Sequence, residues 1–96
     1  METLKLTKKQ AAALNIMRNL DRPVFPDEIA AEEPATFEKG GKSVSPLMNG
    51  FFTKELVTKA DVVREVTDKN GNKISKPYKQ YTLTEAGKSV EFEIKD

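Results

Sequence analysis

This chain of 96 residues lacks most of the residue types that perform chemistry in proteins. It has no cysteine and no histidine, which excludes thiolate catalysis, disulfides and the commonest acid–base group and metal ligand. Its serines therefore have no imidazole to activate them. Gly41-Lys42-Ser43 lacks the first glycine of a phosphate-binding loop, and Asp68-Lys69-Asn70-Gly71 lacks the ligand spacing of a calcium loop. We expect a protein that is not an enzyme and that has no cofactor or metal.

The formal net charge of +1 conceals a segregation of charge along the chain. Residues 27–38 contain five acids and no base, and residues 69–79 contain four lysines and no acid. Such segregation can orient a protein in an electric field even when the total charge is small. We expect the basic stretch to contact phosphate groups; the alternative is that its lysines only protect an exposed hairpin from aggregation. The acidic stretch is either a solvated surface or a contact for a basic protein partner.

The first predicted helix runs from Thr7 to about residue 21. Thr7 and Gln10 have the spacing of a capping box, and Pro23 favours extended geometry for the residue before it, which ends the helix. Val24 and Phe25 then predict a very short strand or an extended corner between two prolines. The apolar stripe of the helix consists of Ala13, Ile16, Met17 and Leu20.

A short second helix is predicted from Pro26 to about Pro34, because proline suits the first position of a helix. A loop over residues 34–41 follows. The apolar periodicity then predicts a third helix over residues 43–55, and Pro46 prevents a much earlier start because proline is tolerated only in a first turn. Gly50 lies inside this helix at a cost in stability, which suggests that another helix or a ligand approaches the backbone there. Its core stripe is Val44, Leu47, Met48 and Phe51, whereas Phe52 is either core or exposed.

Residues 57–83 are predicted to form a β-hairpin. The first arm is rich in valine, Asn70-Gly71 is typical of a two-residue turn, and Pro77 indicates an edge strand or a bulge. Tyr78 and Tyr81 are expected to pack against the helices. Thr84-Glu85 begins a last short helix, and residues 85–95 form either one helix or a helical turn and then a strand. The apolar face of this tail either packs on its own domain or pairs with a second copy; we favour a homodimer, which could read two half-sites.

The order helix, short strand, helix, helix, hairpin, short helix is that of a winged helix-turn-helix. The stretch Ser43-Val44-Ser45-Pro46-Leu47 with Leu56-Val57 resembles the recognition helix and next strand of MarR-like winged-helix regulators. Residues 81–88, with the run Leu-Thr-Glu-Ala-Gly-Lys, resemble the end of their wing. The resemblance covers residues 7–90 and implies one α+β domain over residues 1–96. The loop before the third helix is longer than is usual in that family, and Pro46 stands where a basic or polar residue is common.

The resemblance implies a small transcriptional regulator that binds double-stranded DNA. The helix at residues 43–55 would lie in the major groove and the hairpin would act as a wing on the DNA backbone. Asparagine can pair with adenine, hydroxyls can contact bases or phosphates, and lysine can contact phosphate. Ser43 is either a contact or, as we favour, the N-cap of the helix. The candidate DNA-binding residues are Lys42, Ser43, Ser45, Asn49 and Thr53, with Lys69, Lys73, Lys76 and Lys79 in the hairpin.

The alternative function is a winged-helix module that binds a protein of the transcription or replication machinery. The near-neutral net charge and the absence of arginine from the third helix favour this alternative. No apolar run approaches the roughly 20 residues of a membrane span, and the first five residues do not resemble a signal peptide. We therefore expect a cytoplasmic protein without a membrane partner.

Overall fold

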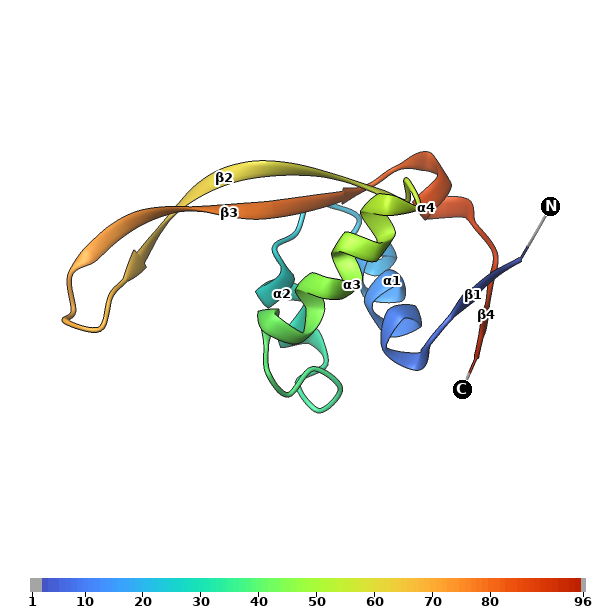
Figure 1. Ribbon diagram of the computed structural model, residues 1–96, viewed down its shortest axis with the longest axis horizontal. Coiled ribbons are helices and arrows are strands. Elements are labelled where there is room, and N and C mark those ends of the chain that lie inside the picture. The colour runs from blue at the N-terminus through green and yellow to red at the C-terminus, as the bar shows by residue number, and fades with distance from the viewer. Residues whose placement is uncertain (1–2, 96) are drawn as a thin grey trace.

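The computed structural model describes residues 3–95, which form an α+β fold with a helical body and a long β-hairpin (Figure 1). The described residues contain four helices and four strands, in two separate two-stranded sheets. In chain order the elements are β1 (Leu4–Leu6), α1 (Lys8–Leu20), α2 (Pro26–Glu32), α3 (Gly41–Thr53), β2 (Val57–Thr67), β3 (Lys73–Leu83), α4 (Glu85–Ser89) and β4 (Phe92–Ile94).

Helix α1 has the predicted start, end and buried face. The Thr7 hydroxyl accepts the Gln10 N–H at 3.2 Å, and the Gln10 side chain accepts the Thr7 N–H at 2.9 Å. This reciprocal cap satisfies two N–H groups that the helix leaves unpaired. The helix ends at Leu20, where Asp21 adopts a left-handed conformation with φ 48°. Its buried residues are Ala11, Ala13, Leu14, Ile16 and Met17.

The segment between α2 and α3 is anchored by a residue that the sequence pattern did not mark. Phe37 is only 2% exposed and belongs to the core. The carbonyl of Glu33 accepts the N–H groups of Thr36 and Phe37, and the carbonyl of Phe37 accepts that of Gly40. An isolated aromatic residue in an acidic loop has no periodic partners, so periodicity could not assign it to the core.

The predicted bounds of the third helix were wrong by two residues at each end. Helix α3 begins at Gly41 and ends at Thr53, and its N-cap is Gly40 rather than Ser43. Gly40 has φ 64°, which glycine adopts readily and which turns the chain directly into the helix. Pro46 therefore lies two residues deeper in the helix than expected, beyond its first turn. Its missing N–H leaves the carbonyl of Lys42 without a helical partner, a single lost bond that the helix tolerates.

The expectation of a close approach at Gly50 was also wrong for contacts within the chain. A Cβ atom built on Gly50 would have no heavy atom within 4 Å. The glycine is therefore not required by the packing of the described residues.

Strands β2 and β3 pair antiparallel in continuous register from Val57↔Leu83 to Thr67↔Lys73. The segment predicted to be a very short strand or an extended corner contains a single β-bridge, in which Val24 and Tyr81 exchange backbone hydrogen bonds of 2.8 and 2.7 Å. This bridge joins the connection between α1 and α2 to the base of the hairpin. Pro77 pairs with Val63 in a two-stranded sheet, so it occupies an edge strand as expected.

The hairpin turn differs from the predicted two-residue type. A type I′ turn needs positive φ at Asn70, but among residues 3–95 only Asp21 and Glu55, besides two glycines, have positive φ. Gly71 donates its N–H to the Asp68 carbonyl, and the Asp68 carboxylate accepts from Asn70 at 2.8 Å and Asn72 at 2.9 Å. The aspartate therefore favours a longer turn with Gly71, at φ 84°, in the left-handed position.

Residues 85–95 form a short helix and then a strand, which decides between the two alternatives for the tail. Strand β4 pairs parallel with β1, a strand that sequence analysis did not anticipate. The Arg18 guanidinium of α1 donates to the carbonyls of Gly87 at 3.1 Å and Val90 at 2.7 Å and so holds the tail against α1. Val90 and Phe92 thus pack on their own domain, whereas Ile94 stays 56% exposed. A homodimer stays a prediction.

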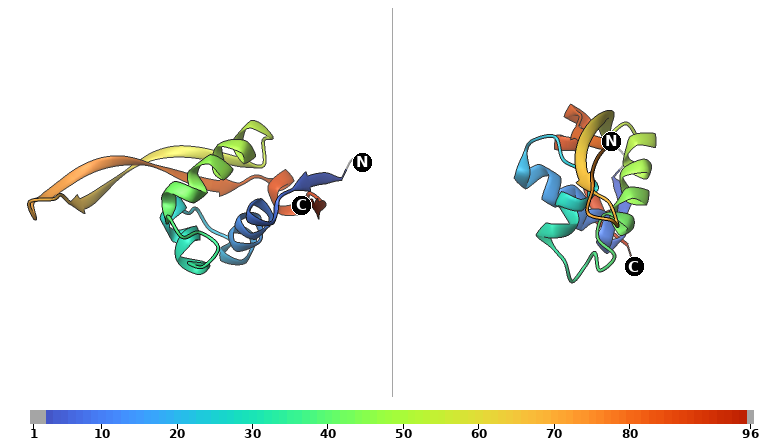
Figure 2. Two further views of the ribbon diagram at one scale, coloured as in Figure 1. Left: turned by 60° about the horizontal axis from the view of Figure 1, so that its bottom comes forward. Right: turned by 90° about the vertical axis from the view of Figure 1, so that its left-hand side faces the viewer.

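The hairpin gives the molecule an elongated shape of 51 × 26 × 20 Å. The radius of gyration is 14.2 Å, whereas about 12.5 Å is typical of a compact chain of this length. Figures 1 and 2 show the hairpin tip projecting well past α2 and α3, with β1 and β4 at the opposite end. None of the helices in the described part of the chain is long and apolar enough to cross a membrane.

Candidate nucleic-acid interface

Helix α3 exposes the side that the helical wheel predicted. Lys42, Asn49 and Thr53 are exposed together with Pro46, and Ser45 is half-buried on the flank. The opposite side is anchored in the core by Val44, Met48 and Phe51, each 0% exposed. Because side chains three and four residues apart share a helical face, the exposed residues form one continuous surface along α3.

The three hydroxyl groups of α3 are already used as donors to the helix itself. Ser43 donates to the Gly40 carbonyl at 2.8 Å, Ser45 to that of Gly41 at 3.0 Å and Thr53 to that of Asn49 at 3.0 Å. These hydroxyls can still accept hydrogen bonds. Within the described part of the chain the side chains of Lys42 and Asn49 have no ion-pair or hydrogen-bond partner, so these two groups are available to an incoming ligand.

The four hairpin lysines do not form one surface. Alternate residues of a strand point to opposite faces, and paired residues share a face. Lys73 and Lys79 therefore lie on one face with Val63, whereas Lys76 lies on the other face opposite Arg64. Lys69 is in the exposed turn at the tip.

Acids of β2 stand across from two of these lysines. Lys79 forms an ion pair with Asp61, its direct cross-strand partner, and Lys73 Nζ lies 3.6 Å from a carboxylate oxygen of Glu65. Lys69 and Lys76 form no ion pair among the residues that the structure describes. No acid interrupts residues 69–79 in the sequence, but the strand register places Asp61 and Glu65 of β2 close to two of these lysines. The composition of the stretch does not reveal this register.

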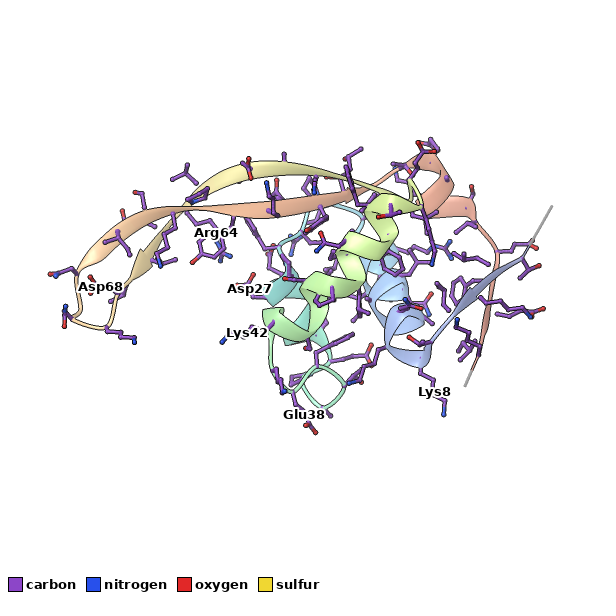
Figure 3. All side chains as sticks on the ribbon, viewed as in Figure 1. Lys8, Asp27, Glu38, Lys42, Arg64 and Asp68 are labelled. Carbon is purple, nitrogen blue, oxygen red and sulfur yellow. The ribbon has the colours of Figure 1, made fainter. Side chains whose placement is uncertain are left out.

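Arg64 of β2 lies beside the candidate residues of α3 and was not identified from the sequence. It points from the middle of the hairpin toward the start of α2, as Figure 3 shows together with Asp27 and Lys42. Its Nη1 atom donates to both carboxylate oxygens of Asp27, at 3.1 and 3.2 Å. An open hollow of about 280 Å³ lies at this junction, and it is lined by Pro26, Asp27, Gly41, Ser45, Arg64, Val66 and Tyr78.

Two exposed apolar side chains lie near, but outside, the predicted site. Phe52 is 40% exposed at the end of α3, and the ammonium of Lys59 lies 4.3 Å from the centre of its ring. Val63 is 68% exposed on the hairpin face that carries Lys73 and Lys79. Tyr81 is buried in the core as expected, and Tyr78 is half-buried beside Arg64.

Tyr81, at the base of the hairpin, has a shifted pKa. Burial raises the pKa of Tyr81 above its ordinary value of 10.0, and the nearby Lys79 charge partly opposes this change. Across residues 3–95 no cluster of acidic side chains has the geometry to hold a metal ion. No family model, curated protein or solved structure matches the chain, so its own residues carry the functional argument.

Proposed function

We propose that this chain is a non-enzymatic winged helix-turn-helix protein that binds double-stranded DNA. Helix α3 would enter the major groove and the β2–β3 hairpin would act as the wing. The observation that supports this proposal most strongly is the placement of α3. Its exposed side offers the unpartnered groups of Lys42 and Asn49, beside a long hairpin with further free cations at Lys69 and Lys76.

The charge of the hairpin supports contact with the DNA backbone. Residues 57–83 contain six bases and three acids, so the hairpin has a positive net charge. Phosphate contacts by Lys69 and Lys76 would supply affinity without reading sequence, and Asn49 would supply what base preference exists. Lys73 and Lys79 would contribute less, because acids already neutralise them. The biological role that corresponds to such DNA binding is transcriptional regulation in the cytoplasm.

A second candidate function, a winged-helix module that binds a protein, is favoured by a different observation. Asp61 and Glu65 interrupt the positive surface of the hairpin, and Phe52 and Val63 expose apolar area that phosphate contacts do not need. Exposed aromatic and aliphatic side chains are typical anchors of protein interfaces. A partner of the transcription or replication machinery would fit this alternative.

A titration with duplex DNA at several salt concentrations tests the first proposal. Wild-type protein should bind at about 50 mM salt and lose affinity steeply as the salt concentration rises. The double variant Lys69→Gln, Lys76→Gln should weaken binding to all duplexes and reduce the salt slope by about two. Its matched control is Lys73→Gln, Lys79→Gln, which removes the same charge from the paired lysines and should have a smaller effect.

Base reading by α3 needs a separate variant. Asn49→Ala should remove about 1–3 kcal/mol of preference for one base pair and leave non-specific affinity nearly intact. Asn49 is exposed, so the fold should survive the change. Folded wild-type protein that shows no DNA binding at low salt would refute the DNA proposal and favour the protein-binding module.

A further inference from the structure

Arg64 is held on three sides in the middle of the hairpin. Its guanidinium lies 4.2 Å from the ring centre of Phe25 and 5.3 Å from that of Tyr78. The same group donates to both oxygens of Asp27. Arginine suits such a place because its planar group can stack on aromatic rings and bind a carboxylate at the same time. We call these four residues the Arg64 clamp.

The Arg64 clamp is a second point of support for the hairpin. The first is the base, where Val57 and Tyr81 are buried and Tyr81 is bonded to Val24. Arg64 lies seven residues along β2 from Val57 and pairs with Lys76, so it sits between the base and the tip. An isolated two-stranded hairpin is only marginally stable. A strand pair that was supported at its base alone would therefore change its direction easily.

The clamp also connects the hairpin to the start of α3. Asp27 lies in the first turn of α2, and a Cβ atom on Gly41 would lie 3.3 Å from the Asp27 backbone nitrogen. The first turns of α2 and α3 are thus packed together at the residue that Arg64 binds. A change in the clamp would alter the angle between the hairpin and α3 rather than the fold of either element.

We propose that Arg64 and Asp27 are positioning residues that set the angle between the hairpin and α3, so that both engage one DNA duplex at the same time. The part of this inference that concerns DNA rests on the proposed function. The part that concerns the hairpin angle is a property of the free protein. The two parts are tested by separate measurements.

The hairpin angle can be measured because the chain has no cysteine of its own. Cysteines at the exposed positions of Asn70, in the turn, and Asn15, on α1, would carry a pair of spin labels. The distance distribution should be narrow in the otherwise wild-type chain and should broaden in Asp27→Asn and in Arg64→Gln. Lys79→Gln is the matched control, because it breaks an ion pair inside the hairpin and should leave the distribution narrow.

DNA binding gives a readout that loss of stability alone would not produce. Asp27→Asn removes a negative charge, so electrostatics alone predicts tighter binding to DNA. If the Arg64 clamp sets the hairpin angle, Asp27→Asn should instead bind more weakly to a duplex of about two helical turns. Such a duplex is longer than the 51 Å molecule. Affinity for that duplex should fall about tenfold, because α3 and the hairpin would no longer be held at the angle at which both contact the DNA together. Affinity for a duplex of about one turn, which α3 alone can occupy, should not fall.

Glu32→Gln is the control for charge, since it removes an acid from the exposed end of the same helix. It should leave binding to both duplexes unchanged or slightly tighter. Narrow distributions in both Asp27→Asn and Arg64→Gln, with the protein folded, would overturn the clamp. Equal or tighter binding of Asp27→Asn to the long duplex would overturn its role in DNA binding. If wild-type protein binds no DNA, the proposed function fails, while the distance measurement still decides whether the clamp sets the hairpin angle.

Discussion

Two glycines show how the space around a single Cβ position decides what a residue does. Gly87 lies in the run Leu-Thr-Glu-Ala-Gly-Lys, which gave the most specific sequence resemblance. A Cβ atom there would lie 2.0 Å from the Leu56 carbonyl oxygen. Thr84 accepts the Gly87 N–H at 3.1 Å and donates to the Glu55 carbonyl at 2.8 Å. This motif therefore joins α4 to the start of β2 and has a structural role.

Gly87→Ala should destabilise the protein strongly. The clash involves the backbone of Leu56 and cannot be relieved by rotating a side chain, so the loss should be about 1–3 kcal/mol or more. Urea denaturation followed by circular dichroism measures it. A variant as stable as wild type would show that α4 can move away from Leu56 at little cost.

Gly50→Ala should have the opposite effect. The position is helical and open, so alanine should raise the free energy of unfolding by about 0.5–1 kcal/mol by restricting the unfolded chain. The same denaturation experiment tests both glycines, and each variant is the control for the other. A loss of stability in Gly50→Ala would contradict the open surroundings of this residue.

At the scale of elements, the hairpin depends on local contacts at its tip. The tip projects past the helices, so its conformation is set by the turn itself (Figure 1). Asp68 provides the acceptor that organises this turn, because its carboxylate binds the N–H groups of Asn70 and Asn72. The Arg64 clamp and the base of the hairpin lie too far along the strands to replace these bonds.

Asp68→Ala should therefore loosen the tip and leave the helical body intact. Hydrogen exchange at the amides of Asn70 and Asn72 should become faster, while the amides of α1 and α3 keep their protection. Asp68→Asn keeps a carbonyl acceptor and should retain slow exchange. A large drop in melting temperature in Asp68→Ala would contradict the local character of the turn.

For the whole molecule, Tyr81 connects the hairpin, the segment before α2 and the core. It is 3% exposed and exchanges two backbone hydrogen bonds with Val24. Burial raises its pKa above 10.0. Ionisation of this phenol is thus coupled to the unfolding of the entire body.

This coupling predicts an alkaline loss of stability. As the pH rises past 10.0, the ordinary pKa, the unfolded chain loses the Tyr81 proton before the folded chain does. The contribution of the neutral phenol is fully present below that pH and is lost as the pH rises through the higher folded-state pKa. The free energy of unfolding should therefore fall above pH 10.0, and Tyr81→Phe should flatten the fall. An unchanged slope in Tyr81→Phe would assign the alkaline loss to other groups.

Local patterns determined much of this protein before any tertiary contact was known. The cap of Thr7 and Gln10, the apolar stripes of α1 and α3, and the extended residues around Val24 are confirmed. The span of the hairpin and the exposed side of α3 are confirmed as well. Each of these features depends on neighbours within a few residues, where helical and strand periodicity are directly visible. The absence of cysteine and histidine needs no structure at all.

Tertiary structure decided the features that depend on residues far apart in the chain. The burial of Phe37, the pairing of β4 with β1 and the acids opposite Lys73 and Lys79 have no local pattern. The pairing of Arg64 with Asp27 joins positions 37 residues apart. The physical reason is that strand register and helix packing bring such groups together through contacts made elsewhere, chiefly in the core. Sequence thus determined which surfaces this protein presents, and only the tertiary structure decided which charges on those surfaces remain free.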